Sequence, residues 1–140
     1  MAFLLDTNII SELRRNDRAA AGVLKWRRSV AFEEIYISVL VLGEMRRGVE
    51  LKRRRDPVSA RVFEKWLREV ETVYRERVLP ITREICDIWG RTSVDIAISP
   101  VDGLIAATAI HHELTVVTRN EADFQRIGVD FFNPFTGGKP

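Results

Sequence analysis

The chain has 140 residues, of which 46% are hydrophobic and 30% are charged, and its formal net charge is +2. This length and composition predict a single domain over residues 1–140, with an apolar core and a well-solvated surface. The only cysteine is Cys86, which excludes an intramolecular disulfide, and no apolar run has the length of a signal peptide or a membrane span. We therefore expect a soluble protein of the reducing cytoplasm, with no membrane association.

Short apolar runs alternate with longer segments in which apolar residues recur at helical spacing. In chain order, we expect a strand at 2–5, helices at 9–15 and 18–28, a strand at 35–38, helices at 39–55 and 57–73, a strand at 78–80, helices at 82–98 and 100–112, a strand at 115–118, a brief helix after Asn120, a strand at 129–132 and a turn-rich tail at 133–140. Asp17, Asp56 and Asn120 are the expected caps of the helices that follow them. This alternation predicts an α/β domain of three layers, α/β/α, with a mainly parallel central sheet.

Four carboxylates fall at or just after an expected strand end, or in the opening turns of the helix that follows. They are Asp6, Glu44, Asp102 and Asp123. Open parallel sheets gather ligands in the crevice beyond the carboxyl edge of their strands, so these acids are expected to lie close together. Hard divalent cations such as Mg²⁺ and Mn²⁺ favour carboxylate oxygen. The sequence therefore predicts a metal site made of these four side chains.

Each acid also has a purely structural explanation. Asp102 and Asp123 occupy capping-box positions, where a carboxylate stabilises the start of a helix. Asp6 alone would serve a turn, and Glu44 alone would be a surface acid, although the uncharged run at 39–43 before it favours a position in a cleft. Two such charges at ~4 Å repel by about 1 kcal/mol in water and about 4 kcal/mol at an intermediate dielectric. Without metal, at least one carboxylate should therefore have a raised pKa.

A cluster of cations lies in and beyond the middle of the expected helix at 39–55. Its members are Arg46, Arg47, Lys52, Arg53, Arg54 and Arg55. Such a cluster either meets phosphate groups or is a solvated helix end whose charges complement the helix dipole. Both interpretations stay open. His111 and His112 lie at an expected helix C-terminus, where cationic character suits the dipole, so we interpret them as structural.

Four ordered motifs, together with a short ending, resemble one family nearly end to end. The matching segments are 3–15 (FLLDTNIISELRR), 38–48 (SVLVLGEMRRG), 100–109 (PVDGLIAATA), 117–124 (VTRNEADF) and the ending 133–135 (NPF). They resemble the PIN-domain ribonucleases, specifically the VapC and FitB branch of toxins from bacterial toxin-antitoxin pairs. A departure from the family pattern is Glu113, where relatives often carry glycine, and this places the turn before the strand at 115–118 in question.

The resemblance implies a PIN-like fold and metal-assisted hydrolysis of an RNA phosphodiester with bound Mg²⁺ or Mn²⁺. It implies that Asp6 and Asp102 are direct ligands, and that Glu44 and Asp123 complete the metal's shell or act through water. Thr7 and Asn120 would orient these carboxylates by hydrogen bonding. For Asn8 a structural role is left open, and Thr118 and Arg119 are left outside the catalytic set.

The resemblance also implies partners. These are an RNA substrate, a second copy of the chain in a homodimer, and a cognate antitoxin that wraps the toxin and offsets its acids with an arginine or lysine, with DNA contacted only through that antitoxin. Two alternatives remain. A phosphatase of the haloacid dehalogenase type also begins with a strand that ends in aspartate, but it usually has a second acid where this chain has Asn8. A non-catalytic PIN module within a DNA-binding antitoxin complex would not require the four acids.

Overall fold

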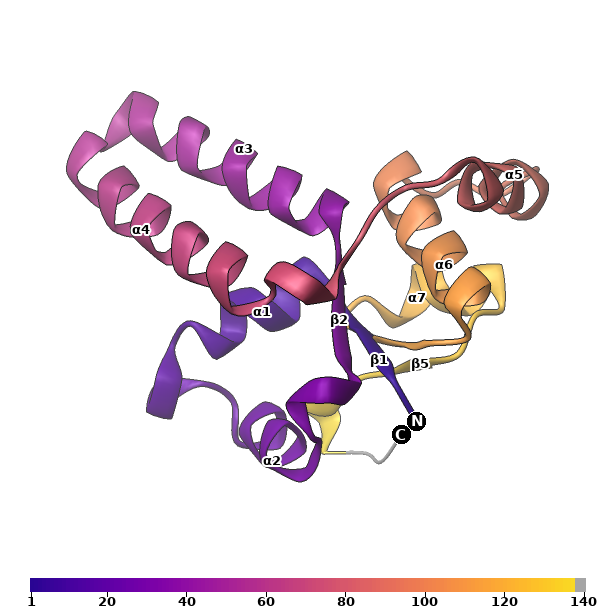
Figure 1. Cartoon of the computed structure of the whole chain (residues 1–140), viewed down its shortest axis with the longest axis horizontal. Helices are drawn as coiled ribbons and strands as arrows, with labels where there is room; N and C mark the ends of the chain where they lie inside the picture. The colour runs from indigo at the N-terminus through magenta and orange to yellow at the C-terminus, as the bar shows by residue number, and fades with distance from the viewer. Residues whose placement is uncertain (138–140) are drawn as a thin grey trace.

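The computed structural model describes residues 1–137 and contains a five-stranded sheet (Figure 1). Its strands are β1 (Phe3–Leu5), β2 (Ile35–Ser38), β3 (Val78–Leu79), β4 (Thr115–Val117) and β5 (Phe131–Phe132). They lie in the order β3-β2-β1-β4-β5, and every neighbouring pair is parallel. The parallel sheet predicted from the sequence is therefore confirmed.

Helices lie on both sides of this sheet (Figure 1). The described residues form α1 (Thr7–Leu13), α2 (Ala21–Ser29), α3 (Val39–Arg55), α4 (Pro57–Val73), α5 (Arg83–Thr92), α6 (Pro100–His112) and α7 (Glu121–Ile127). All three residues of β1 are buried, as expected for a central strand covered on both faces. The three-layer α/β/α arrangement is confirmed.

The strand register brings the carboxyl ends of β1, β2 and β4 to one edge of the sheet. Leu5 pairs with Ile37 on β2 and with Val117 on β4, so the next residues, Asp6 and Thr118, begin side by side. The chain runs outward from β1 to β3 and then returns to the other side of β1 as β4. The strand order therefore reverses between β1 and β4, which is where open α/β sheets bind ligands.

Two helical pairs flank this edge. The α3–α4 hairpin turns at Asp56, whose carboxylate accepts hydrogen bonds from the backbone N–H of Ser59 (3.1 Å) and from its hydroxyl. On the other side α5 packs on α6, and a Cβ on Gly103 would lie 2.8 Å from Cδ1 of Trp89. Only glycine permits this close approach, which sets the position of the N-terminal turn of α6.

Several helix boundaries differ from those expected. The first helix begins at Thr7 rather than at residue 9, because Asp6 accepts a hydrogen bond from its N–H. The helix expected at 18–28 forms, but its expected start and its cap at Asp17 are wrong: Asp17 lies in a short 3₁₀ helix, η1 (Asn16–Arg18), and α2 begins at Ala21. The N–H of Ala20 is instead capped by the carboxylate of Glu12 at 2.7 Å, from α1.

The helix expected at 82–98 is correct at its start and wrong at its end. Thr82 caps α5 by accepting a hydrogen bond from the N–H of Ile85. The helix ends at Thr92, and Asp95 then has a left-handed backbone with φ of 63°. A left-handed residue cannot continue a right-handed helix, so the chain crosses to α6 as a loop.

The turn before β4 forms with glutamate in place of glycine. Glu113 is the C-cap of α6, with φ of 55° in the left-handed region. Of the turn-rich tail expected at 133–140, Pro134–Thr136 form a 3₁₀ turn, and residues 138–140 lie outside the described part of the chain. Within residues 1–137, none of the helices combines the length and the apolar character needed to cross a membrane.

Candidate metal centre

Asp6 is a buried carboxylate, 5% exposed, held at the end of β1 by three donors. Its Oδ1 accepts from the N–H of Thr7 (2.8 Å), and its Oδ2 accepts from Nδ2 of Asn8 (3.1 Å) and from the hydroxyl of Thr118 (2.8 Å). Burial raises the pKa of Asp6, while the hydrogen bonds from Thr118, Thr7 and Asn8 oppose that rise. The side chain is therefore fixed in one orientation at the switch point of the sheet.

Thr118 and Asn8 connect the ends of β1 and β4, and the sequence did not place either among the site residues. Thr118 is buried, and its hydroxyl also accepts from the N–H of Asn120 (2.9 Å). Asn8 accepts from the N–H of Arg119 (3.1 Å) through its side-chain oxygen. The sequence signal for Thr118 was its position at an expected strand end. The contact of Thr118 with Asp6 depends on β1 and β4 being neighbours, which no local pattern reveals.

Glu44 reaches the site from the second turn of α3. Its Oε1 accepts a hydrogen bond of 2.6 Å from the hydroxyl of Thr7, which lies in the first turn of α1. Thr7 thus contacts two of the four acids, Asp6 through its N–H and Glu44 through its hydroxyl. Glu44 also lines a cavity of about 320 Å³, so its expected position at a cleft is confirmed.

Asp102 and Asp123 face each other across the amide of Asn120. Nδ2 of Asn120 lies 2.9 Å from Oδ2 of Asp123 and 3.4 Å from Oδ2 of Asp102. Asn120 makes no side-chain cap for α7, so the expectation that it caps this helix is wrong. Ser99 does cap α6, by accepting from the N–H of Asp102 at 3.2 Å.

The four acids share one electrostatic environment. The pKa of Asp102 is raised from 3.8 to about 6, first by burial and then by the negative charges of Asp6, Glu44 and Asp123, with a hydrogen bond from Ser99 acting in the opposite direction. These charges act on Asp102 only because the fold brings all four carboxylates into one region. The raised pKa expected for a metal-free acidic cluster is confirmed.

The donor set fits a hard divalent cation that keeps part of its water. Among residues 1–137, no three acidic, histidine or cysteine side chains converge on a single point closely enough to enclose an ion. Mg²⁺ usually binds through one or two carboxylates and retains several waters, so it needs no such enclosure. Asp6 and Asp102 would supply oxygen from opposite sides of the switch point, and a cation would offset the excess negative charge between them.

His111 and His112 lie at the C-terminal end of α6, whereas Asp102 lies in its first turn. Their rings are 4.8 Å apart in an edge-to-face arrangement, and both residues are exposed. Nine residues of helix separate them from the site, a distance of about 13 Å along the axis. Neither histidine therefore contacts the acidic cluster, which agrees with their structural interpretation.

The cavity beside Glu44 lies between α1, α3 and α4. Its apolar wall is formed by Met45, Val49, Phe63, Trp66 and Leu67, and Thr7, Ser11 and Lys52 stand with Glu44 among its polar residues. The guanidinium of Arg14 covers the ring of Phe63 at 3.9 Å. The acidic site thus opens directly onto an apolar groove.

A family model described as PIN domain matches residues 3–130. Among curated relatives, Toxin FitB of Neisseria gonorrhoeae is 33% identical (94% of this chain, 97% of that one), and VapC ribonuclease Y4jK of Sinorhizobium fredii is 34% identical (94% and 96%). The crystal structure of FitAcB from Neisseria gonorrhoeae has a TM-score of 0.84 at 32% identity (95% and 98%). A toxin-antitoxin complex from Klebsiella pneumoniae shares the fold, with a TM-score of 0.71 at 22% identity (96% and 98%). The resemblance to the VapC and FitB branch is confirmed, and the chain belongs to the PIN domain family.

Proposed function

We propose that this protein is a metal-dependent endoribonuclease and the toxin of a toxin-antitoxin pair. The observation that carries the proposal is the gathering of four carboxylates at the switch point of a PIN fold, where burial and the negative charges of the other three acids raise the pKa of Asp102 to about 6. Relatives at 33–34% identity are named as a toxin and as a ribonuclease, which supports the same activity here.

Asp6 and Asp102 would bind the metal directly, and Glu44 and Asp123 would complete its shell directly or through water. When bound, Mg²⁺ or Mn²⁺ supplies Lewis-acid chemistry, which lowers the pKa of water and shields phosphate oxygens. Thr7 and Asn120 would orient the carboxylates that they contact. We extend this orienting role to Thr118 and Asn8, because both donate to Asp6.

Glu44 and Asp123 are the candidates for positioning the attacking water. Oε1 of Glu44 is engaged by Thr7, which leaves Oε2 able to accept a hydrogen bond from a water at the mouth of the groove. Oδ2 of Asp123 is engaged by Asn120, and Oδ1 lies 3.6 Å from a guanidinium nitrogen of Arg126. In either case the carboxylate would orient the water for in-line attack on phosphorus.

The apolar groove supports an antitoxin partner. An antitoxin helix could place an apolar side chain in the cavity against Met45, Phe63 and Trp66. A cationic side chain next to it would then reach Glu44 and the other acids, which would block the site and offset its charge. Homodimer formation, contact with DNA through the antitoxin, and a cytoplasmic location stay predictions.

Of the two alternatives, the phosphatase loses its remaining support. Asn8 stands where that chemistry needs an acid, and its amide is engaged with Asp6 and with the backbone of Arg119. A non-catalytic PIN module would leave the acidic cluster without a purpose. Burial raises the pKa of Asp6 and Asp102, and the other three acids raise that of Asp102 further, so these two carboxylates oppose folding at neutral pH.

The test is cleavage of a mixed RNA pool with Mg²⁺ or Mn²⁺ and with EDTA. We expect cleavage only with metal, and a loss of at least ~100-fold in Asp6→Asn, because a direct ligand of the metal is replaced. Asp102→Asn serves as a second variant, since Asp102 is less buried and its replacement disturbs fewer hydrogen bonds. Asp17→Asn, at an exposed acid of η1, is the matched control. Cleavage in EDTA, or full cleavage by both site variants, would contradict the proposal.

A further inference from the structure

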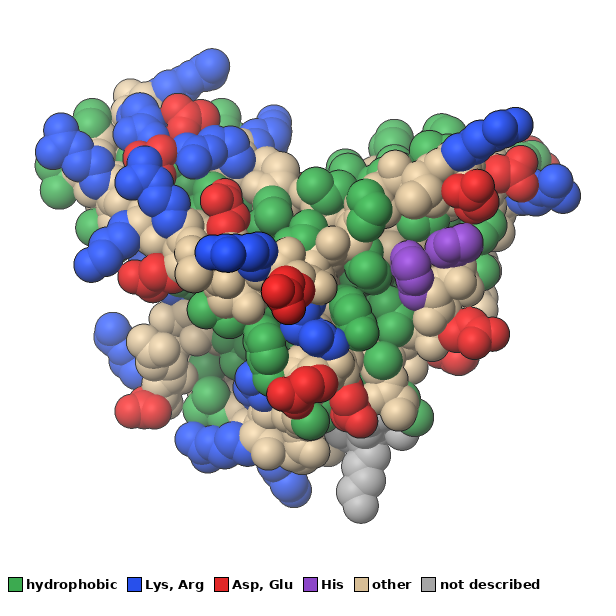
Figure 2. All heavy atoms as spheres, viewed as in Figure 1, with side chains coloured by type: hydrophobic (Ala, Val, Ile, Leu, Met, Phe, Trp, Pro, Cys, Tyr) green, Lys and Arg blue, Asp and Glu red, His purple; other side chains and the backbone are tan. Residues whose placement is uncertain are grey.

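The α3–α4 hairpin carries the positive charge of this protein. Residues 46–68 contain nine Lys and Arg against three Asp and Glu, a net charge of +6, whereas the remaining residues contain 13 and 17, a net charge of −4. Blue side chains accordingly crowd the lobe that Figure 1 identifies as this hairpin (Figure 2). The uneven distribution needs a physical explanation.

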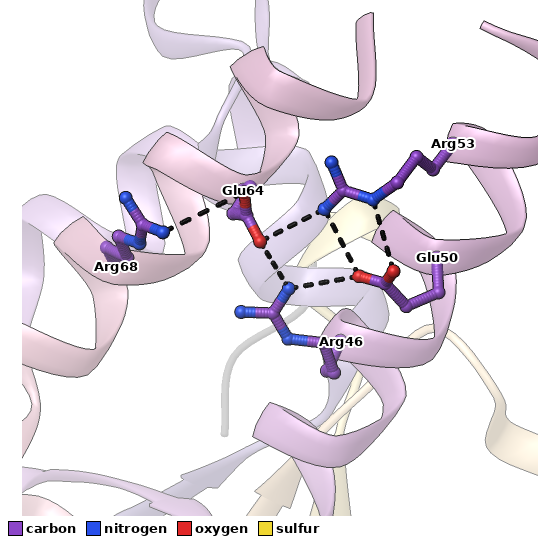
Figure 3. A network of polar contacts seen from close by, with 5 residues as sticks. All are labelled: Arg46, Glu50, Arg53, Glu64 and Arg68. Carbon is purple, nitrogen blue, oxygen red and sulfur yellow. Dashed lines mark hydrogen bonds and ion pairs between the residues drawn. The ribbon is translucent and has the colours of Figure 1, made fainter. Parts of the chain in front are cut away.

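Part of this charge is used to join the two helices. Glu64 of α4 accepts from Arg46 (2.6 Å) and Arg53 (3.0 Å) of α3, and Glu50 pairs with the same two arginines (Figure 3). The hydrogen bond from Arg46 holds the pKa of Glu64 below its ordinary value. Arg68 adds a longer contact to Glu64 at 3.8 Å. These three arginines therefore have a structural role within the hairpin.

Six exposed cations of the hairpin remain outside this network. They are Arg47, Lys52, Arg54, Arg55, Arg61 and Lys65. Within residues 1–137, none of them has a carboxylate within ion-pair distance, as the charged pairs of the described chain involve other residues. The helix dipole accounts for those in the last turn of α3. It does not account for Arg61 and Lys65, which lie in the N-terminal half of α4.

One face of α3 joins these unpaired cations to the acidic site. Glu44, Gly48, Lys52 and Arg55 are spaced by four, four and three residues, so they form a single row that we call the α3 strip. Gly48 and Lys52 line both the cavity beside Glu44 and a second hollow, of about 510 Å³, which Arg54 and Arg55 also line. The strip is thus hollowed along its length, about 16 Å at the rise of an α-helix.

No structural requirement within the described chain explains why residue 48 is glycine. Its backbone is helical, and a Cβ there would meet no atom within 4 Å, so neither conformation nor packing requires glycine. Glycine inside a helix destabilises it relative to alanine. Glycine also permits the closest approach of another molecule to a helix, and at position 48 such a molecule would lie between the acids and Lys52.

We propose that the α3 strip is the path along which single-stranded RNA approaches the metal centre, with its phosphates on Lys52 and Arg55 and its backbone passing over Gly48. This inference rests on the proposed ribonuclease function. One row of cations follows one phosphate backbone. The adjoining cavity presents Phe63 and Trp66, and aromatic rings bind bases that are unpaired rather than held inside a duplex.

The first experiment measures the binding of a fluorescein-labelled oligouridylate of about 12 nucleotides in EDTA, where the metal-dependent reaction is absent. Lys52→Ala/Arg55→Ala should weaken binding at least ~10-fold and reduce the slope of log K against log salt by about 1.4, since each phosphate contact on a single strand contributes about 0.7. Arg47→Ala/Arg61→Ala removes the same charge from exposed positions off the strip and should change binding less than about threefold. Equal weakening by both pairs would show that only bulk charge matters and would overturn the proposal.

A second pair of variants tests the approach over Gly48. Gly43 is also helical and also has open space at its Cβ, but it does not lie on the strip. Gly48→Gln and Gly43→Gln should each raise the Tm, because glutamine favours a helix. Only Gly48→Gln should weaken RNA binding. If both variants bind RNA as the unmodified protein does, no backbone passes over Gly48 and the path is wrong.

The two proposals fail in different ways. A protein that cleaves RNA with Mg²⁺ or Mn²⁺, but whose strip variants bind the oligouridylate normally, keeps the ribonuclease function and loses the strip. A protein that neither binds nor cleaves RNA loses both. Equal weakening of binding to duplex DNA of the same length by Lys52→Ala/Arg55→Ala would overturn the single-stranded assignment.

Discussion

The two sides of the acidic cleft hold their carboxylates in different ways. On the β1 side, Asp6 is buried and receives three hydrogen bonds, from Thr7, Asn8 and Thr118. On the α6 side, Asp102 and Asp123 lie in the first turns of helices, and the one amide of Asn120 contacts both. On the first side three donors fix the carboxylate at the sheet edge, while on the second a single shared amide connects Asp102 with Asp123.

This difference assigns the two sides different tasks. A carboxylate with three fixed donors is oriented before any ligand arrives, so Asp6 needs little reorganisation to bind a cation. Asp102, whose pKa is raised to about 6 by burial and by the other three acids, gains more when a cation removes that repulsion. We therefore expect the β1 side to define the position of the metal and the α6 side to respond to it.

The largest expected effect is that of Asp102→Asn on catalysis. Replacing this ligand should reduce RNA cleavage by more than ~100-fold with Mg²⁺ or Mn²⁺, because the metal loses one of its two direct carboxylates. Cleavage rates under single-turnover conditions measure this change. Asp130→Asn, at an exposed acid that directly precedes β5 and so lies at the amino end of that strand, should cleave normally. Normal cleavage by Asp102→Asn would remove the α6 side from the site.

A smaller effect is expected from the groups that orient the carboxylates. Asn120→Ala should weaken Mn²⁺ binding by about 10–100-fold, as is usual for such a partner, because Asp102 and Asp123 lose the amide they share. Thr118→Val should weaken it less, since Asp6 retains Thr7 and Asn8, and Thr118→Ser should restore it. Calorimetric titration with Mn²⁺ compares the three variants. A greater loss in Thr118→Val than in Asn120→Ala would reverse the comparison between the two sides.

The pH dependence of metal-free stability tests the repulsion on the α6 side. Because the folded pKa of Asp102 is raised above 3.8 to about 6, the folded state binds a proton there more tightly than the unfolded chain. The stabilising contribution is present below about pH 4 and is lost as the pH rises through about 6. The full shift would correspond to ~3 kcal/mol, and solvent screening of this half-exposed group reduces it to about 1 kcal/mol.

Asp102→Asn mimics the protonated carboxyl group, so comparing it with the unmodified protein measures the stability that is lost when Asp102 ionises. In EDTA, its Tm should match that of the unmodified protein near pH 4 and exceed it at pH 7.5, with the gap opening as the pH passes 6. Thermal unfolding across this range gives the curve. A constant gap at all pH values would mean that neither burial nor the neighbouring acids raise the pKa of Asp102.

The smallest effect is expected at the far end of α6. Glu113→Gly places glycine at the left-handed C-cap, where φ is 55°. Relief of the strain, less the greater entropy of glycine in the unfolded chain, should stabilise the fold by about 0.5 kcal/mol. Chemical denaturation measures the gain, and Mn²⁺ binding should stay unchanged. A change in Mn²⁺ affinity would show that the C-cap of α6 is coupled to the acidic site at the N-terminal end of the same helix.

Local sequence patterns were sufficient to predict an element where its bounds depend on residues within or next to it. The five strands, the α3–α4 hairpin capped at Asp56 and the start of α6 at Ser99 follow from apolar runs and caps that lie within a few residues of each other. The start of α2 depends on Glu12, eight residues before Ala20 and in another helix. The end of α5 depends on the left-handed Asp95, which no periodicity indicates.

The same distinction applies to the candidate site. The four acids were predicted because their residue type and strand-end positions are visible in the sequence, and the fold brings them into one region. Thr118 was not, because its bond to Asp6 requires β4 to lie beside β1 across more than a hundred residues. Asn8 lies only two residues from Asp6, but its second contact, to the backbone of Arg119, depends on the same strand pairing. The assignment of roles among the acids and the one-domain organisation of residues 1–140 stay predictions.

The most direct test of the metal centre is an anomalous difference map from a crystal grown with Mn²⁺. The predicted result is a Mn²⁺ peak in direct contact with Asp6 and Asp102, with Glu44 and Asp123 in contact with the ion or with its waters. A Mn²⁺ ion bound elsewhere on the protein, with these four carboxylates free of metal, would contradict the central claim.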